Sequence, residues 1–104
     1  KAAAMEKQRL MWEQFCQKYS GRLSAEETRA GREEALQMLE KKDTLPPIRL
    51  KIAKYISDGY TLERNLPKAL EYLEIARDAD PESQAAKKLE PWIDNMRKHI
   101  NQEK

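Results

Sequence analysis

The sequence is poor in the residues that build chemical sites. It has one cysteine and one histidine among 104 residues, and it contains no glycine-rich phosphate loop or nucleophile motif. A lone cysteine cannot form an internal disulfide, and a metal site needs several converging nitrogen, sulfur or oxygen ligands. Because Cys16 and His99 stand far apart in the chain, the sequence predicts no metal, no cofactor and no enzyme activity.

Long apolar runs and an excess of one charge are also missing. No stretch approaches the roughly 20 apolar residues of a membrane span, so no span is predicted. The 20 basic and 18 acidic residues are interspersed, with a net charge of only +2, whereas nucleic-acid binding normally needs clustered lysine and arginine. Nucleic acid therefore ranks behind protein as a partner. It would use the basic residues of the last helix, which are Lys87, Lys88, Arg97 and Lys98.

Glycine and proline are scarce, with three and five copies, and no convincing strand alternation occurs. Alanine, leucine, glutamate, lysine, arginine and glutamine are abundant, which is typical of amphipathic helices. Apolar residues recur at helical spacing in five stretches separated by turn residues. The sequence therefore predicts an all-α fold with about five helices.

Local signals mark several helix ends and one close contact. Ser24 with Glu27 three residues later forms a capping box, and Asn65 is expected to cap the fourth helix. Gly31 weakens the second helix by roughly 1 kcal/mol relative to alanine, so we expect it to mark a close contact. Pro91 should kink or restart the last helix.

A shift of 34 residues superimposes parts of the second and fourth helices. The matched pairs are Ala69 with Ala35, Leu70 with Leu36, Leu73 with Leu39, Glu74 with Glu40 and Pro81 with Pro47. A period near 34 is that of a helix–turn–helix repeat. An alanine at a helix crossing lets two backbones approach, and a leucine one turn later fills the groove beside it.

On these positions the chain resembles the tetratricopeptide repeat family and the related Sel1-like repeats. The residues that carry the resemblance are Ala53, Ile56, Ser57, Tyr60, Ala69, Leu73, Ala76 and Pro81. Arg64 is a departure, because it replaces the usual turn glycine. The resemblance implies a single domain over residues 1–104, a short α-solenoid of antiparallel helix hairpins. It places a degenerate repeat at about 2–46, a better repeat at 47–80 and a C-terminal capping helix at 81–102.

In tetratricopeptide arrays the first helix of each unit lines a concave groove that takes peptides. The positions that match here are Lys51, Lys54 and Asp58, and spacings of three and four put them on one helical face. Two lysines there would favour an acidic segment or a free carboxylate; the alternative is an ordinary solvated face. Tyr55 and Trp92 would supply apolar anchors if exposed, although core packing is the default for Trp92.

The resulting hypothesis is a non-catalytic protein–protein interaction module, an adaptor or scaffold that docks a peptide or helix of a partner protein. The second hypothesis is an oligomerisation or assembly domain of a larger protein, in which the first helix pairs with another copy or with the rest of the chain. Cys16 shares a helical side with Trp12 and Tyr19, so we expect it in the core as a small apolar residue.

Overall fold

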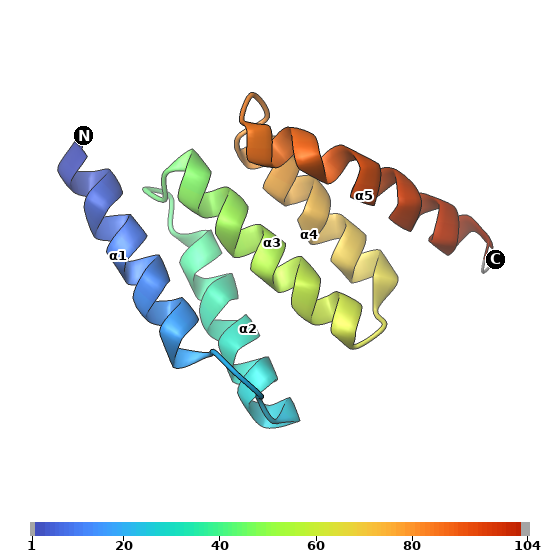
Figure 1. Ribbon diagram of the computed structural model, residues 1–104, viewed down its shortest axis with the longest axis horizontal. Coiled ribbons are helices and arrows are strands. Elements are labelled where there is room, and N and C mark those ends of the chain that lie inside the picture. Colours follow the sequence, from blue (N-terminus) through green and yellow to red (C-terminus); the bar gives the residue numbers. More distant parts are fainter. Residues whose placement is uncertain (1, 103–104) are drawn as a thin grey trace.

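The computed structural model describes residues 2–102, and this range contains five helices. They are α1 (Ala2–Lys18), α2 (Ala25–Glu40), α3 (Pro46–Leu62), α4 (Leu66–Ala79) and α5 (Gln84–Gln102). The helices follow one another across the molecule, and each runs roughly opposite to the one before it (Figure 1). The predicted all-α class is confirmed, and no strand occurs within residues 2–102.

Side-chain caps start α2 and α4 where the sequence predicts them. The backbone N–H of Glu27 donates to the Ser24 hydroxyl at 3.1 Å, and the Glu27 carboxylate accepts from the Ser24 N–H at 3.0 Å. This reciprocal pair is a capping box. The Asn65 side chain accepts from the N–H of Lys68 at 3.4 Å and caps α4. Both predicted caps are confirmed.

The turn between α3 and α4 contains a residue in the left-handed conformation. Arg64 has a φ of 62°. Its N–H donates to the Thr61 carbonyl at 3.0 Å, and the Asn65 N–H donates to the Tyr60 carbonyl at 2.9 Å. These two bonds form a Schellman motif, whose left-handed position glycine usually occupies. Arg64, which replaces the usual turn glycine of the repeat pattern, is therefore the residue of this turn that has a positive φ.

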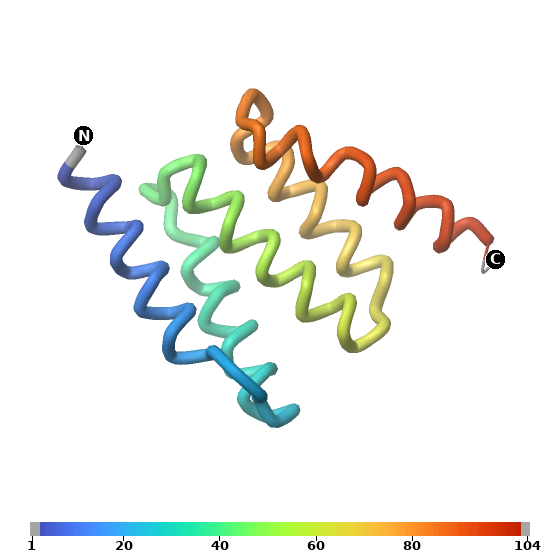
Figure 2. The backbone as a smooth tube through the Cα atoms, in the orientation of Figure 1, coloured from blue at the N-terminus to red at the C-terminus, as the bar shows by residue number. Residues whose placement is uncertain are grey.

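Two adjoining groups of buried side chains hold the helices together. The first joins α3, α4 and α5 and consists of Leu50, Ala53, Leu73, Ala76, Ala86, Leu89 and Ile93. The second joins α1, α2 and α3 and consists of Trp12, Phe15, Ala35, Ile48, Ile52 and Ile56. Because α3 contributes to both groups, it is the central helix of the fold, as its place in the middle of the array in Figure 2 also shows.

Small residues lie at the crossing of α3 and α4. Ala69 and Ala76 are fully buried, as is Ala35 in α2. The hydroxyl of Ser57, also buried, donates a 2.7 Å hydrogen bond to the carbonyl of Ala69 across this crossing. Small side chains let the two helices approach closely, so the packing predicted for these alanines is confirmed.

Helix α1 is held mainly by aromatic rings. The rings of Trp12 and Phe15 pack edge-to-face on Tyr55 of α3, with centroids 5.9 and 5.0 Å apart. Gly31 of α2 lies against the ring of Tyr19 and the hydroxyl of Tyr55, so the close contact predicted for this glycine is confirmed. These rings pack α1 on α3 more closely than on α2.

The expectation for Cys16 is wrong, and of the two alternatives expected for Pro91 the restart is wrong. Cys16 is exposed, because Trp12 and Phe15 fill the buried side of α1. Pro91 does not restart the last helix, since α5 continues through it. Proline removes one backbone donor, and the carbonyl of Lys87 four residues earlier lies on an exposed part of the helix where water can take its place.

Candidate functional site

Lys54, Asp58 and Trp92 meet on one face formed by α3 and α5. The Nζ atom of Lys54 lies 5.1 Å from the centre of the Trp92 ring, which is within the range of a cation–π interaction. The same nitrogen lies 3.1 Å from the carboxylate of Asp58, one turn further along α3. The sequence predicts all three as candidate residues for binding a partner. It does not predict their mutual contact, since Trp92 lies on a different helix.

The burial pattern of α3 separates this face from the core. Ala53 and Ile56 are fully buried, whereas Lys51 and Asp58 are exposed and Lys54 is half-buried. Lys51, Lys54 and Asp58 therefore lie on the side of α3 that faces away from the core. Lys51 takes part in no ion pair with another residue of the range 2–102, so its charge is available to a ligand.

Trp92 supplies an exposed aromatic ring on this face. Its exposed fraction is 52%, although Ile93, the next residue of α5, is fully buried. The core packing expected by default for Trp92 is wrong, because Ala86, Leu89 and Ile93 already form the buried side of α5. The indole of Trp92 is therefore exposed, which is what an apolar anchor for a ligand requires.

Tyr55 is placed differently from Trp92. Its ring is half-buried among the aromatic residues of α1, and burial raises the pKa of its hydroxyl above the ordinary value. Of the two aromatic residues considered as anchors, Trp92 is thus the exposed one, and Tyr55 contributes to the packing of α1 on α3.

The basic residues of α5 do not form an uninterrupted positive surface. Arg97 lies 2.6 Å from the carboxylate of Glu74 in α4 and 3.9 Å from that of Asp94. Lys87 and Lys98 are exposed and lie on either side of Asp94 in the chain. Nucleic-acid binding depends on clustered positive charge, and acidic groups interrupt the positive charge of α5.

Cys16 lies near this face but lacks the electrostatics of a reactive thiol. Burial raises the pKa of the Cys16 thiol, and the nearby charge of Lys51 opposes that rise only in part. Reactive cysteines have lowered pKa values.

Within residues 2–102 no cluster of His, Cys, Asp and Glu side chains is placed to hold a metal ion. None of the helices in that range is long and apolar enough to cross a membrane.

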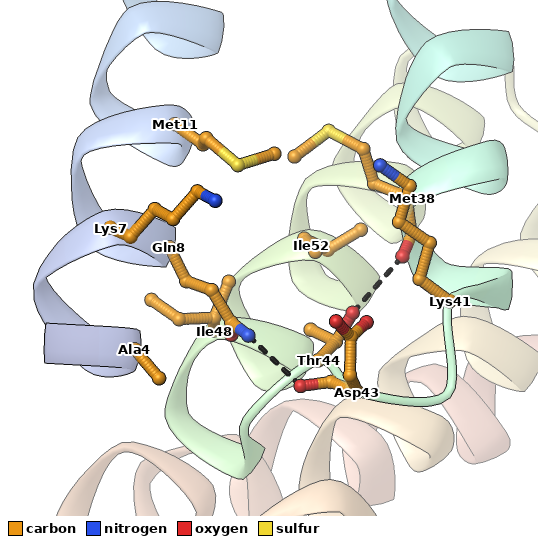
Figure 3. A pocket seen from close by; sticks show the side chains of 10 residues that line it. All are labelled: Ala4, Lys7, Gln8, Met11, Met38, Lys41, Asp43, Thr44, Ile48 and Ile52. Carbon is orange, nitrogen blue, oxygen red and sulfur yellow. Dashed lines mark hydrogen bonds between the residues drawn. The ribbon is translucent and has the colours of Figure 1, made fainter. Parts of the chain in front are cut away.

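A second surface feature, which sequence reasoning missed, is a groove between α1 and α2 with α3 beneath it. It consists of two adjoining hollows of about 370 and 400 Å³, which share Met11, Met38 and Lys41. Figure 3 shows Met11 and Met38 extending towards each other from opposite walls. The groove exists because the aromatic residues of α1 pack on α3 and leave part of α1 apart from α2.

Side chains of Gln8 and Arg49 form hydrogen bonds to the loop between α2 and α3, which closes one end of this groove. The Gln8 amide donates to the carbonyl of Asp43 at 2.9 Å, drawn in Figure 3, and accepts from the N–H of Leu45 at 2.8 Å. The Arg49 guanidinium donates to the carbonyls of Leu39 and Lys41, both at 2.9 Å. A cation at the end of α2 is favoured by the helix dipole. The loop is thereby fixed from α1 and from α3.

The candidate surfaces are therefore the face that carries Lys51, Lys54, Asp58 and Trp92, called the α3–α5 face below, and the α1–α2 groove. Comparison of the chain with protein-family models, with curated proteins and with solved structures finds no match.

Proposed function

We propose that this chain is a non-catalytic protein–protein interaction module, an adaptor or scaffold that docks a peptide or helix of a partner protein on the α3–α5 face. The observation that carries the proposal is the exposed Trp92 ring beside the Lys54 ammonium. A tryptophan gains a large buried area when a partner covers it, and such residues commonly dominate interface energetics.

The charges of the face favour an acidic partner. Lys51 is exposed and forms no ion pair within residues 2–102, while Lys54 shares its charge with Asp58. A carboxylate of the ligand is attracted to Lys51 and Lys54 and repelled by Asp58, so it binds towards the Lys51 end of α3. Asp58 thus sets the direction in which an acidic segment lies on the face.

The resemblance to tetratricopeptide repeats supports the same proposal. In this interpretation α1 and α2 form the degenerate unit at about 2–46, α3 and α4 form the better unit at 47–80, and α5 is the capping helix within 81–102. The first helices of such arrays present a shared binding surface. In this interpretation, contact between Lys54 of α3 and Trp92 of α5 puts the capping helix on the same face as the first helix of the better unit.

Selection from a random-peptide display library tests the proposal. We expect wild-type protein to enrich peptides that combine Asp or Glu with apolar residues. These peptides should bind at least tenfold more weakly to K51E/K54E and to W92A. The matched control K87E/K98E makes the same charge change at exposed positions of α5 and should retain binding. Enriched peptides that lack acidic residues and bind every variant equally would contradict the proposal.

Self-association is the second candidate function, and Leu62 favours it. Its side chain is 80% exposed and borders two hollows beneath the connection between α1 and α2, which Leu23 also lines. An exposed leucine beside a partly apolar hollow is typical of a contact site. We expect sedimentation at micromolar concentration to show association that L62E abolishes; a monomer at every concentration contradicts this function.

A further inference from the structure

The α1–α2 groove has walls that follow helical spacing. Its α1 wall includes Lys7, Met11, Gln14 and Lys18, which recur at intervals of three and four residues and so form one stripe along the helix. This stripe lies beside the separate one that carries Trp12 into the core. Both walls run along helix axes, so the groove has the elongated form that accepts a helix.

The middle of the groove is apolar and adaptable. Met11 is 39% exposed, and it extends towards Met38 over the α3 residues Ile48 and Ile52 (Figure 3). Methionine side chains are unbranched and flexible, so they can move aside and pack around an inserted group. The hollows on the two sides of this methionine pair, about 370 and 400 Å³, are of a size that takes ligand side chains.

The first hollow of the groove carries a net positive charge. Lys7 and Lys41 lie on opposite walls at the end near the α2–α3 loop, which also contributes Asp43 (Figure 3). Neither lysine forms an ion pair with another residue of the range 2–102. This end is therefore net positive.

In the second hollow, Lys18 is paired and, within residues 2–102, Lys41 is not. Lys18 lies 3.1 Å from the carboxylate of Glu34, which also accepts a hydrogen bond from the Tyr19 hydroxyl. The positive charge that no carboxylate of residues 2–102 pairs with thus comes from Lys7, in the first hollow, and from Lys41, which lines both hollows.

We propose that the α1–α2 groove binds an amphipathic helix of a partner protein that carries acidic residues beside its apolar stripe. The apolar side chains of this helix pack on Met11 and Met38, and one of its carboxylates lies between Lys7 and Lys41. The docked helix fills the space where α1 and α2 do not pack closely. The inference does not depend on the α3–α5 face, which is a different surface.

Methionine-methyl NMR spectra of the intact chain test this inference. The chain has four methionines, of which Met11 and Met38 line the groove and Met96 lies in α5. The probes are two synthetic helical peptides of about five turns (~18 residues), which share one leucine stripe and carry either glutamate or lysine beside it. We expect the glutamate peptide to shift the Met11 and Met38 resonances, to leave Met96 unchanged, and to bind at least tenfold more tightly than the lysine peptide.

Charge reversal in the groove supplies the matched variant. K7E/K41E changes two exposed side chains and should reverse the preference between the two peptides. K51E/K54E should leave that preference unchanged, so failure of this inference is distinguishable from failure of the α3–α5 proposal. Circular dichroism confirms that each variant keeps its helix content.

Three results would overturn the inference. The first is that neither peptide moves the Met11 and Met38 resonances. The second is equal affinity of the two peptides for the wild type or an unchanged preference in K7E/K41E. The third is movement of these resonances with protein concentration alone, which would assign the groove to a second copy of the chain.

Discussion

The hydroxyl oxygen of Tyr55 lies so close to Gly31 that a Cβ atom at position 31 would be 2.6 Å from it. Two ring carbons of Tyr19 would be 3.2 Å from the same Cβ atom. Tyr19 belongs to α1, Gly31 to α2 and Tyr55 to α3, so three helices meet at this point. Gly31 lies inside α2 without a positive φ, so glycine is needed here for space and not for its backbone freedom.

Gly31→Ala should destabilise the fold through this contact. Alanine favours a helix by about 1 kcal/mol over glycine, but overpacking costs about 1–3 kcal/mol. Tyr55→Phe removes the closest atom, so in G31A/Y55F the loss should be at least about 1 kcal/mol smaller than the sum of the single losses. Urea unfolding followed by circular dichroism measures these free energies. Strictly additive losses would show that the two residues do not interact.

Arg64→Gly should stabilise the protein. The left-handed conformation costs a non-glycine residue about 1–2 kcal/mol, and Arg64 adopts it with a φ of 62°. Glycine loses more conformational freedom on folding, so we expect a net gain of about 0.5–1 kcal/mol in the free energy of unfolding. Arg64→Ala keeps the Cβ atom and is the control. Thermal unfolding of the wild type and of both variants measures this gain. Equal stability of Arg64→Gly and Arg64→Ala would contradict the prediction.

Arg49→Ala should destabilise the fold by about 1.5–3 kcal/mol, the usual range for hydrogen bonds to a charged group. Its guanidinium donates to the carbonyls of Leu39 and Lys41 at the end of α2. Arg29 is an exposed residue of α2, so Arg29→Ala should change the free energy of unfolding by less than about 0.5 kcal/mol. Chemical denaturation measures the free energy of unfolding of both variants. Equal losses would mean that the hydrogen bonds of Arg49 to the end of α2 do not stabilise the fold.

The stability of the protein should fall in acid because of Glu27 and Glu34. Hydrogen bonds from Ser24 hold the pKa of Glu27 below its ordinary value. The Tyr19 hydroxyl, followed by Lys18, does the same for the pKa of Glu34. A carboxylate with a lowered folded-state pKa binds fewer protons in the folded protein than in the unfolded chain. Its stabilisation is therefore complete above the unfolded-state pKa and is lost as the pH falls through the folded-state pKa.

We therefore expect the free energy of unfolding to decrease as the pH falls below about 4.3, the ordinary glutamate pKa. The double variant E27Q/E34Q should show a smaller decrease over the same range. Urea titrations at a series of acidic pH values give both curves. Identical pH dependence in the two proteins would show that these carboxylates are not responsible.

Features that depend on neighbours in the chain could be predicted from the sequence. The caps of α2 and α4 require only Ser24 with Glu27 and Asn65 with Lys68, and all lie within three residues of their partners. The burial of Ala69 follows from helical periodicity, because the spacing of small and apolar residues defines the interior side of a helix.

Features that depend on how helices cross could not be predicted. Lys54 meets Trp92 because α3 and α5 lie on one face, and neither residue has a sequence signal for the other. The α1–α2 groove was missed because periodicity gives the buried side of each helix without its distance from the next. Cys16 was misplaced for a related reason: it borders the apolar stripe of α1, and only the packing on Tyr55 shows which residues lie inside.

The dissociation constant of a selected acidic peptide tests the central claim most directly. Isothermal titration calorimetry should give at least tenfold weaker binding to K51E/K54E than to the wild type, which corresponds to about 1.4 kcal/mol. W92A should lose a similar amount, K87E/K98E should stay close to the wild type, and wild-type affinity should fall as salt screens the lysines. Equal dissociation constants for the wild type, K51E/K54E and W92A would contradict the assignment of the α3–α5 face as the docking surface.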